Sequence, residues 1–136
     1  MALILDTNAL SAFADGDSGL RRILEPEYDL ALPAIVLGEY VFGIRQSRFR
    51  VRHETWLHSH RELFLILSVG PETANRYAEI RLELRSAGKP IPTNDLWIAA
   101  LAREHAFPLA SRDKHFELVR GLKLVSWDSG SNPSLQ

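Results

Sequence analysis

The chain has 136 residues and a formal net charge of −1, and its 46% apolar and 24% charged residues are typical of one globular domain. It has no cysteine, which excludes a disulfide framework and a zinc–thiolate site. A charge at Asp6 interrupts the N-terminal apolar run too early for a signal peptide, and no apolar run approaches the roughly 18 residues that span a bilayer, so we expect a cytoplasmic protein without a membrane segment.

In the first half of the chain, short apolar runs alternate with helical patterns. The apolar runs predict buried strands over residues 3–5 and 30–32. Thr7 and Asn8 are expected to cap the first helix. Helices are predicted over residues 9–13, 20–24 and 34–46, and in a later stretch where Trp56, Leu57, His60 and Phe64 have helical spacing. Residues 64–69 suit either the end of that helix or a strand.

The second half continues the alternation. A helix is predicted over residues 72–87 and ends at Gly88, and another begins at residues 93–95 and is apolar on every side over residues 96–102. Strand candidates and a disordered tail complete the chain, over residues 107–110, 122–125 and 129–136. The whole pattern predicts a single α/β domain over residues 1–128, with a central, mainly parallel sheet sandwiched by helices.

Three aspartates stand at places where function and local structure both favour a carboxylate. Asp6 and Asp113 follow strand candidates, and ligands of open α/β sheets bind outside the carboxyl ends of strands. Asp95 stands at the start of the buried helix, with Thr93 or Asn94 as its cap, where the helix dipole favours an ionised carboxylate. Each one alone could equally be a helix cap or a turn residue.

Glu39 is a fourth acid, placed in the middle of a helix. Gly43 lies four residues further on and shares a helical face with it, which would leave room for a ligand. The alternative is a solvated residue on an amphipathic helix. Taken together, the four acids fit one site at the edge of the sheet. Carboxylates held this close repel one another unless they are protonated or bound to a metal, and their oxygens suit Mg²⁺ or Mn²⁺.

Several segments occur together in the order of a known set of motifs: Asp6-Thr7-Asn8, Glu39, Thr93-Asn94-Asp95-Leu96-Trp97-Ile98-Ala99-Ala100 and Ser111-Arg112-Asp113-Lys114-His115-Phe116. They resemble the motifs of PIN-domain nucleases, especially the VapC-like toxins of bacterial toxin–antitoxin pairs. Residues 122–125 resemble the last strand of that family. The resemblance extends from residue 3 to about residue 127 and is most specific over residues 93–100.

The resemblance implies Mg²⁺- or Mn²⁺-dependent hydrolysis of phosphodiester bonds in RNA, a cognate small antitoxin that blocks the site, and a homodimer or a toxin–antitoxin hetero-oligomer. The metal-binding and catalytic residues would be Asp6, Glu39, Asp95 and Asp113. Polar neighbours that could orient these carboxylates are Asn8, Thr93, Asn94 and Ser111. Many relatives carry a further acid two residues after the one matching Asp113; His115 stands there instead, which puts a second metal in doubt.

Two groups of basic residues are candidates for RNA contacts. The densest cluster consists of Arg45, Arg48, Arg50 and Arg52, with Phe49 inside it. A solvated loop or a docking patch for an acidic partner segment is an equal interpretation of this cluster. Residues beside the last acidic motif could also touch substrate: Arg112, Lys114 and His115. Trp56 and Phe64 are expected in the core or at the antitoxin interface.

Two other functions compete with a toxin ribonuclease. One is a PIN nuclease of RNA processing without a toxin role, and the other is an interaction module whose metal site is no longer catalytic. The intact set of four acids argues against the second, and the small size favours a toxin over a processing enzyme. The near-neutral charge argues against a passive nucleic-acid binder, but less against a nuclease whose acidic centre is neutralised by cations.

Overall fold

The computed structural model describes residues 1–24 and 28–127. Its centre is a five-stranded sheet with the order β3-β2-β1-β4-β5, in which every neighbouring pair is parallel. The strands are β1 (Ala2–Leu5), β2 (Asp29–Pro33), β3 (Phe64–Leu67), β4 (Leu109–Ala110) and β5 (Leu124–Val125). The predicted α/β fold with a parallel sheet is therefore confirmed.

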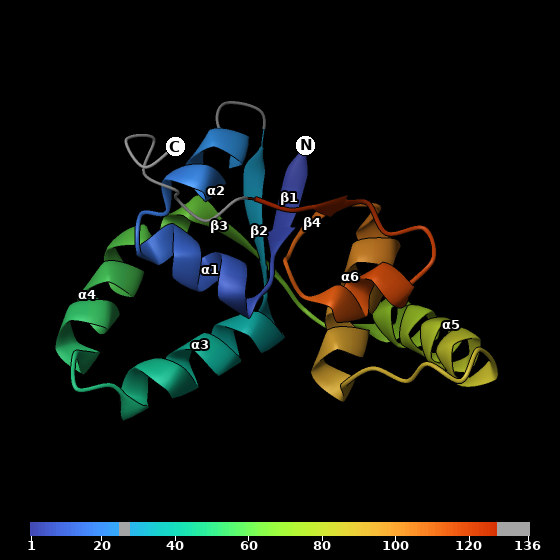
Figure 1. The fold of residues 1–136 in the computed structure, drawn as a ribbon. Helices are drawn as coiled ribbons and strands as arrows, with labels where there is room; N and C mark the ends of the chain where they lie inside the picture. Colours follow the sequence, from blue (N-terminus) through green and yellow to red (C-terminus); the bar gives the residue numbers. More distant parts are fainter. Residues whose placement is uncertain (25–27, 128–136) are drawn as a thin grey trace.

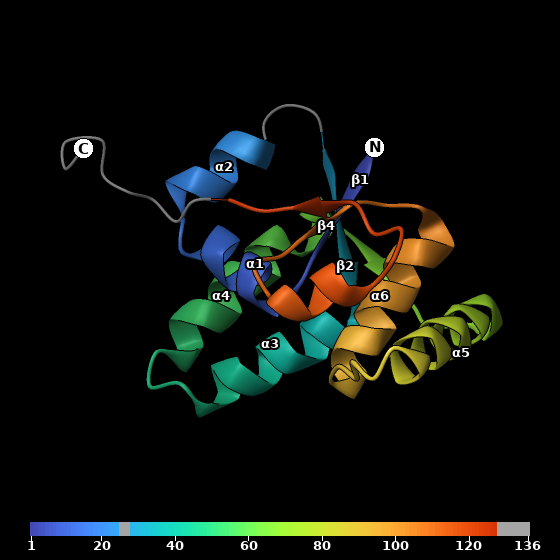
Figure 2. The same ribbon diagram turned by 45° about the vertical axis from the view of Figure 1, so that its right-hand side comes forward.

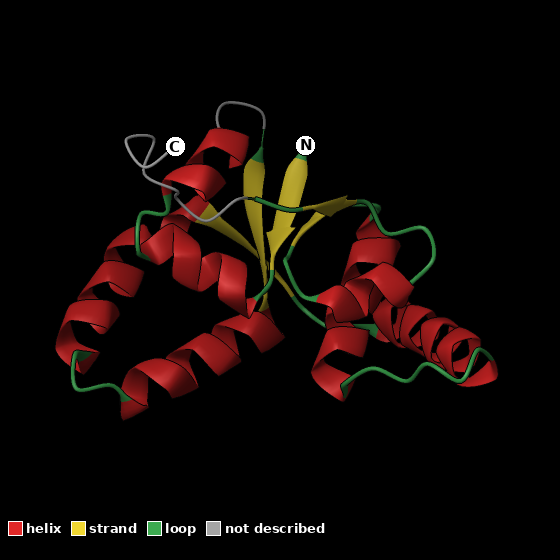
Figure 3. Ribbon diagram, in the orientation of Figure 1, coloured by secondary structure: helices red, strands yellow, loops and turns green. Residues whose placement is uncertain are grey.

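Helices cover both faces of this sheet. They are α1 (Thr7–Ala14), α2 (Ser18–Leu24), α3 (Ala34–Gln46), α4 (Arg50–His60), α5 (Pro71–Ser86) and α6 (Thr93–His105), with short 3-10 turns η1 (Arg61–Leu63) and η2 (Lys114–Leu118). Figure 1 shows α1 to α4 on one side of the sheet and α5 and α6 on the other, and Figure 3 shows the strands enclosed between the two groups of helices. No described helix is long and apolar enough to cross a membrane.

The core lies around β1 and α6. All four residues of β1 are buried, which is why this strand has a continuous apolar sequence instead of the alternating one of a sheet with a solvated face. On the other side, α6 buries its run from Ile98 to Ala102, as its uniformly apolar sequence predicts. The two elements fix the positions from which the polar residues at their ends project.

Parallel pairing also brings the ends of β1 and β4 together. Leu5 pairs with Ala110, and the Asp6 N–H donates to the Ala110 carbonyl at 3.3 Å. The residues that follow the two strands, Asp6 and Ser111, therefore meet at the carboxyl edge of the sheet. This is the edge at which the sequence placed the candidate site.

The sequence erred at two helix starts, and of the two alternatives for residues 64–69 the structure has the strand. Asp6, and not Thr7 or Asn8, is the N-cap of α1, because its side chain accepts the Ala9 N–H. Pro92 precedes α6, so Thr93 and Asn94 lie inside the first turn and neither caps the helix. Phe64 begins β3 instead of extending α4, because the chain turns through η1 first. The tail predicted to be disordered, residues 129–136, and the domain end at residue 128 lie outside the described residues.

Candidate metal-binding active site

Asp6 is the buried member of the candidate site. Its Oδ1 atom accepts the Ala9 N–H at 2.8 Å, and its Oδ2 atom accepts a hydrogen bond from the Ser111 hydroxyl. The Ser111 oxygen in turn accepts the backbone N–H of Asp113 at 3.0 Å. Ser111 thus links the carboxylate at the end of β1 to the segment that carries Asp113, and fixes the orientation of both.

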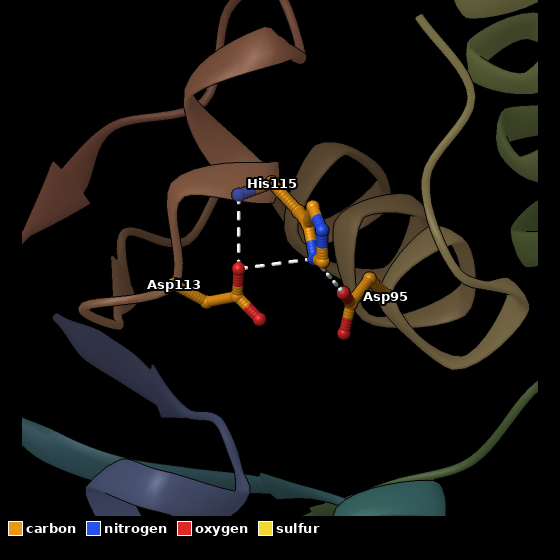
Figure 4. A group of neighbouring side chains, drawn as sticks. All are labelled: Asp95, Asp113 and His115. Carbon is orange, nitrogen blue, oxygen red and sulfur yellow. Dashed lines mark hydrogen bonds and ion pairs between the residues drawn. The ribbon is translucent and has the colours of Figure 1, made fainter.

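Asp95 and Asp113 face each other from different elements, with a histidine between them (Figure 4). Asp113 caps η2 by accepting the His115 backbone N–H on Oδ1 at 2.9 Å. The Nδ1 atom of His115 lies 3.0 Å from Asp95 Oδ2 and 3.0 Å from Asp113 Oδ1. One potential ligand atom from each of these three residues lies within 4.8 Å of the others. Among the described residues, this tight group includes neither Asp6 nor Glu39.

Glu39 approaches the same region from α3. The Thr7 hydroxyl donates to its Oε1 atom at 3.1 Å, which ties the glutamate to the residue directly after Asp6. Glu39 and Gly43 line one groove of about 310 Å³, as expected from their shared helical face. A Cβ atom built on Gly43 would meet nothing within 4 Å, so the space beside the carboxylate is open.

The acids act on one another electrostatically. Burial raises the pKa of Asp6, and the charges of Asp113 and Asp95 raise it further, although hydrogen bonds from Ser111 and Ala9 oppose them. Burial also raises the pKa of Asp95, with the charges of Asp113 and Glu39 adding to it and the His115 hydrogen bond opposing it. Each of the four acids therefore lies in the field of at least one other.

The protein supplies little positive charge to this group. Among residues 1–24 and 28–127, no lysine or arginine forms an ion pair with any of the four acids, and His115 is the only cationic partner of two of them. Converging carboxylate oxygens without lysine or arginine partners are the donor set that Mg²⁺ and Mn²⁺ favour. The residues present therefore fit a divalent cation.

The polar residues expected to orient the acids differ in their surroundings. Ser111 contacts Asp6 and Asp113 as described. Asn8, Thr93 and Asn94 are exposed and, within the described part of the chain, form no hydrogen bond to the four acids. Thr7, whose hydroxyl bonds Glu39, was missed as an orienting residue. Its one sequence signal is that it directly follows Asp6.

The basic residues divide into a distant group and an adjacent one. Arg45, Arg48, Arg50 and Arg52 are exposed around the turn between α3 and α4, which Figures 1 and 2 show at the end of α3 remote from the sheet. Arg112 stacks over Trp127 at 4.5 Å and shares a groove with Asn8 and Asp113. Lys114 is exposed on η2. Arg112 thus lies beside Asp113, whereas the larger cluster surrounds the turn at the end of α3 remote from the sheet.

The two aromatic residues singled out in the sequence belong to the interior. Trp56 packs edge-to-face on Phe13 and Tyr40 and stacks on His60. Phe64 is only 6% exposed in β3. Of the two positions expected for Phe64, the core or the antitoxin interface, the structure has the core.

Comparisons with known proteins agree with this geometry. Residues 3–122 match the family model of the PIN domain. Ribonuclease VapC2 of Rickettsia felis is 29% identical over 133 residues, covering 94% of this chain and 99% of that protein, and Toxin FitB of Neisseria gonorrhoeae is 32% identical, covering 82% and 87%. The chain also superposes on VapBC2 of Rickettsia felis, solved bound to a DNA fragment from its promoter, with a TM-score of 0.85, 26% identity and coverage of 94% and 100%. The chain belongs to the PIN domain family.

Proposed function

We propose that this protein is a divalent-metal-dependent endoribonuclease and the toxin of a toxin–antitoxin pair. The observation that carries the proposal is that Asp6, Glu39, Asp95 and Asp113 lie close enough at one sheet edge to act on one another electrostatically, with no lysine or arginine paired to them among the described residues and His115 as the basic partner of Asp95 and Asp113. The relatives named ribonuclease or toxin support the chemistry and the biological role, since the chain matches them over most of their length.

Each acid has a role in this proposal. Asp6, Asp95 and Asp113 would hold Mg²⁺ or Mn²⁺ directly or through water, and Glu39 would be a ligand or would orient the attacking water. When bound, the ion would lower the pKa of a coordinated water and offset the negative charge that develops on the phosphate. Ser111 and Thr7 would keep Asp6, Asp113 and Glu39 in their orientations.

The grooves beside the acids would receive the RNA backbone. One is lined by Glu39 and Gly43, and another by Asn8, Arg112 and Asp113. Arg112, exposed next to Asp113, can contact a phosphate through its guanidinium.

The catalytic proposal is tested by cleavage of single-stranded RNA. Purified protein should cut RNA in the presence of Mg²⁺ or Mn²⁺, and cleavage should stop in excess EDTA. Asp95→Asn should fold but should not cleave RNA. Glu83→Gln, a change of an acid on the distant α5 helix, is the matched control and should cut like the wild type. Undiminished cleavage in EDTA would contradict the proposal.

The antitoxin proposal rests on an exposed apolar surface as well as on the relatives. Phe42, Phe49 and Val51, on and between α3 and α4, are 65%, 48% and 78% exposed. Such a surface suits an apolar segment of a small partner protein, with the neighbouring arginines facing its acidic residues. Expression without the partner should arrest bacterial growth, and co-expression from the native operon should yield a complex. A lone protein from that operon, harmless on its own, would contradict the toxin role.

A further inference from the structure

We propose that His115 is a direct ligand of the metal ion, so that the site contains nitrogen as well as oxygen and favours a first-row transition-metal dication over Mg²⁺. This inference rests on the proposed metal-dependent function and names the ion class that the same site selects. It starts from the one feature that an all-carboxylate site lacks, an imidazole between two of the acids (Figure 4).

The two spacings between the His115 ring and the acids match those of adjacent ligands of an octahedral ion. With metal–ligand bonds of about 2.1 Å, adjacent ligands of an octahedron lie about 3.0 Å apart. The His115 Nδ1 atom lies 3.0 Å from Asp95 Oδ2 and 3.0 Å from Asp113 Oδ1. Both measured spacings are therefore compatible with one cation that contacts the ring nitrogen and the two carboxylates.

A hydrogen bond from the His115 backbone also helps to position the ring. The backbone N–H of His115 donates to Asp113 Oδ1, so Asp113 caps η2. The acid that caps η2 is therefore also one of the two acids that the His115 ring contacts. Asp95 comes from a different element, the first turn of α6, whose buried face anchors it. The three groups are thus positioned by rigid parts of the fold, as a preformed metal site requires.

The chemistry of the imidazole sets the preference. Mg²⁺ favours oxygen ligands and keeps several waters, whereas imidazole nitrogen suits first-row transition metals. A set of carboxylates plus one nitrogen still accepts Mn²⁺, which makes this ion a suitable paramagnetic probe. The competing interpretation is that His115 only hydrogen-bonds the two acids and leaves when a cation binds.

The test is electron spin-echo spectroscopy of tag-free protein loaded with Mn²⁺. Wild type should show nitrogen modulation from a directly bound imidazole, and the signal should change when histidine is labelled with ¹⁵N. His115→Ala and His115→Asp should lose it. His58→Ala, a change of an exposed histidine on α4, is the matched control and should keep it.

Calorimetry on the same proteins gives a second readout. His115→Ala should weaken Mn²⁺ binding by at least about tenfold, the lower bound for removing a supporting group of a metal site, and should change Mg²⁺ binding much less. His115→Asp should lower the ratio of the Mn²⁺ affinity to the Mg²⁺ affinity, because it replaces the nitrogen ligand by an oxygen that also suits Mg²⁺.

Two outcomes would overturn the inference in different ways. Mn²⁺ binding without nitrogen modulation, and with the same Mn²⁺-to-Mg²⁺ preference in wild type and His115→Asp, would refute His115 as a ligand and leave the proposed nuclease intact. A wild type that binds neither ion would refute both. The spectrum of the wild type needs no variant, so the test survives even if a substitution prevents folding.

Discussion

Two groups of acids in this protein have opposite electrostatic surroundings. On the surfaces of α5 and α6, Arg103 of α6 binds Glu83 of α5 at 2.8 Å, and Arg76 pairs with Glu72 and Glu79 within α5. The Arg103 hydrogen bonds lower the pKa of Glu83. These acids are paired with the protein's own cations.

At the sheet edge, burial and neighbouring acids raise the pKa values of Asp6 and Asp95. Within the described residues, no lysine or arginine pairs with either acid, and the one basic side chain paired with Asp95 is the His115 imidazole. The comparison teaches how to separate structural acids from a functional site. We expect the first group to stabilise the fold, and the second to destabilise the metal-free protein until a bound cation offsets the repulsion.

The largest difference should appear in catalysis. Asp113→Asn should reduce metal-dependent RNA cleavage by about 10²–10³-fold, because a catalytic metal supplies several kcal/mol of transition-state stabilisation. Glu79→Gln, which also neutralises one acid, should leave the rate within about twofold. Cleavage rates under single-turnover conditions measure the effect. Equal losses in the two variants would contradict a functional difference between the sheet-edge acids and the paired acids of α5.

A smaller effect is expected from the residue that orients the site. Ser111→Ala removes the hydroxyl that bonds both Asp6 and the Asp113 backbone, and should weaken metal binding about 10–100-fold. Ser59→Ala, which removes an exposed hydroxyl bonded to the Thr55 carbonyl on α4, is the control. Calorimetric titration with Mn²⁺ measures both. Unchanged affinity in Ser111→Ala would show that the site does not depend on this bridge.

The smallest effect concerns the pH dependence of stability in EDTA, where the two groups of acids should give changes of opposite sign. Glu83 has a lowered pKa, so its contribution to the free energy of unfolding is present at neutral pH and lost as pH falls through that pKa. Glu83→Gln should therefore lower the free energy of unfolding by up to about 1 kcal/mol at pH 7, and by less near pH 4. Asp95 has a raised pKa, so its ionisation destabilises the fold as pH rises above its ordinary value of 3.8. Asp95→Asn should therefore stabilise the metal-free protein at pH 7, and less near pH 4.

Melting temperatures of the wild type and both variants between pH 4 and pH 8 measure these differences. Changes of the same sign in the two variants would mean that the surroundings of the two acids do not differ in the way described.

The sequence predicted much of this arrangement because its signals are local. A continuous apolar run followed by an acid identified β1 and Asp6, and the boundaries of α3 were predicted as observed. The motifs placed Asp95 and Asp113 correctly at the ends of elements. Strands 107–110 and 122–125 are each shorter than predicted, since only the parts that pair with neighbours form ladders.

The remaining features depend on contacts between distant parts of the chain. The Thr7–Glu39 bond spans 32 residues and the His115–Asp95 contact 20, so neither leaves a pattern in one segment. The caps of α1 and α6 were misassigned because Thr and Asn are good caps by composition, whereas Asp6, offered only as an alternative cap, and Pro92 stand at the N-cap positions. The arginine cluster is dense in sequence but lies around the α3–α4 turn, at the end of α3 remote from the sheet.

The central claim is that the four acids share one cation site, and thermal melts of Asp95→Asn and wild type test it most directly. In EDTA at pH 7 the variant should melt higher, because relief of repulsion outweighs the roughly 0.3–1 kcal/mol by which the α6 dipole favours a charge there. Mn²⁺ at 100 times its dissociation constant should add about 2.7 kcal/mol to wild type and much less to the variant, which reverses the order. A variant no more stable than wild type in EDTA, with equal metal shifts in both proteins, would contradict the claim.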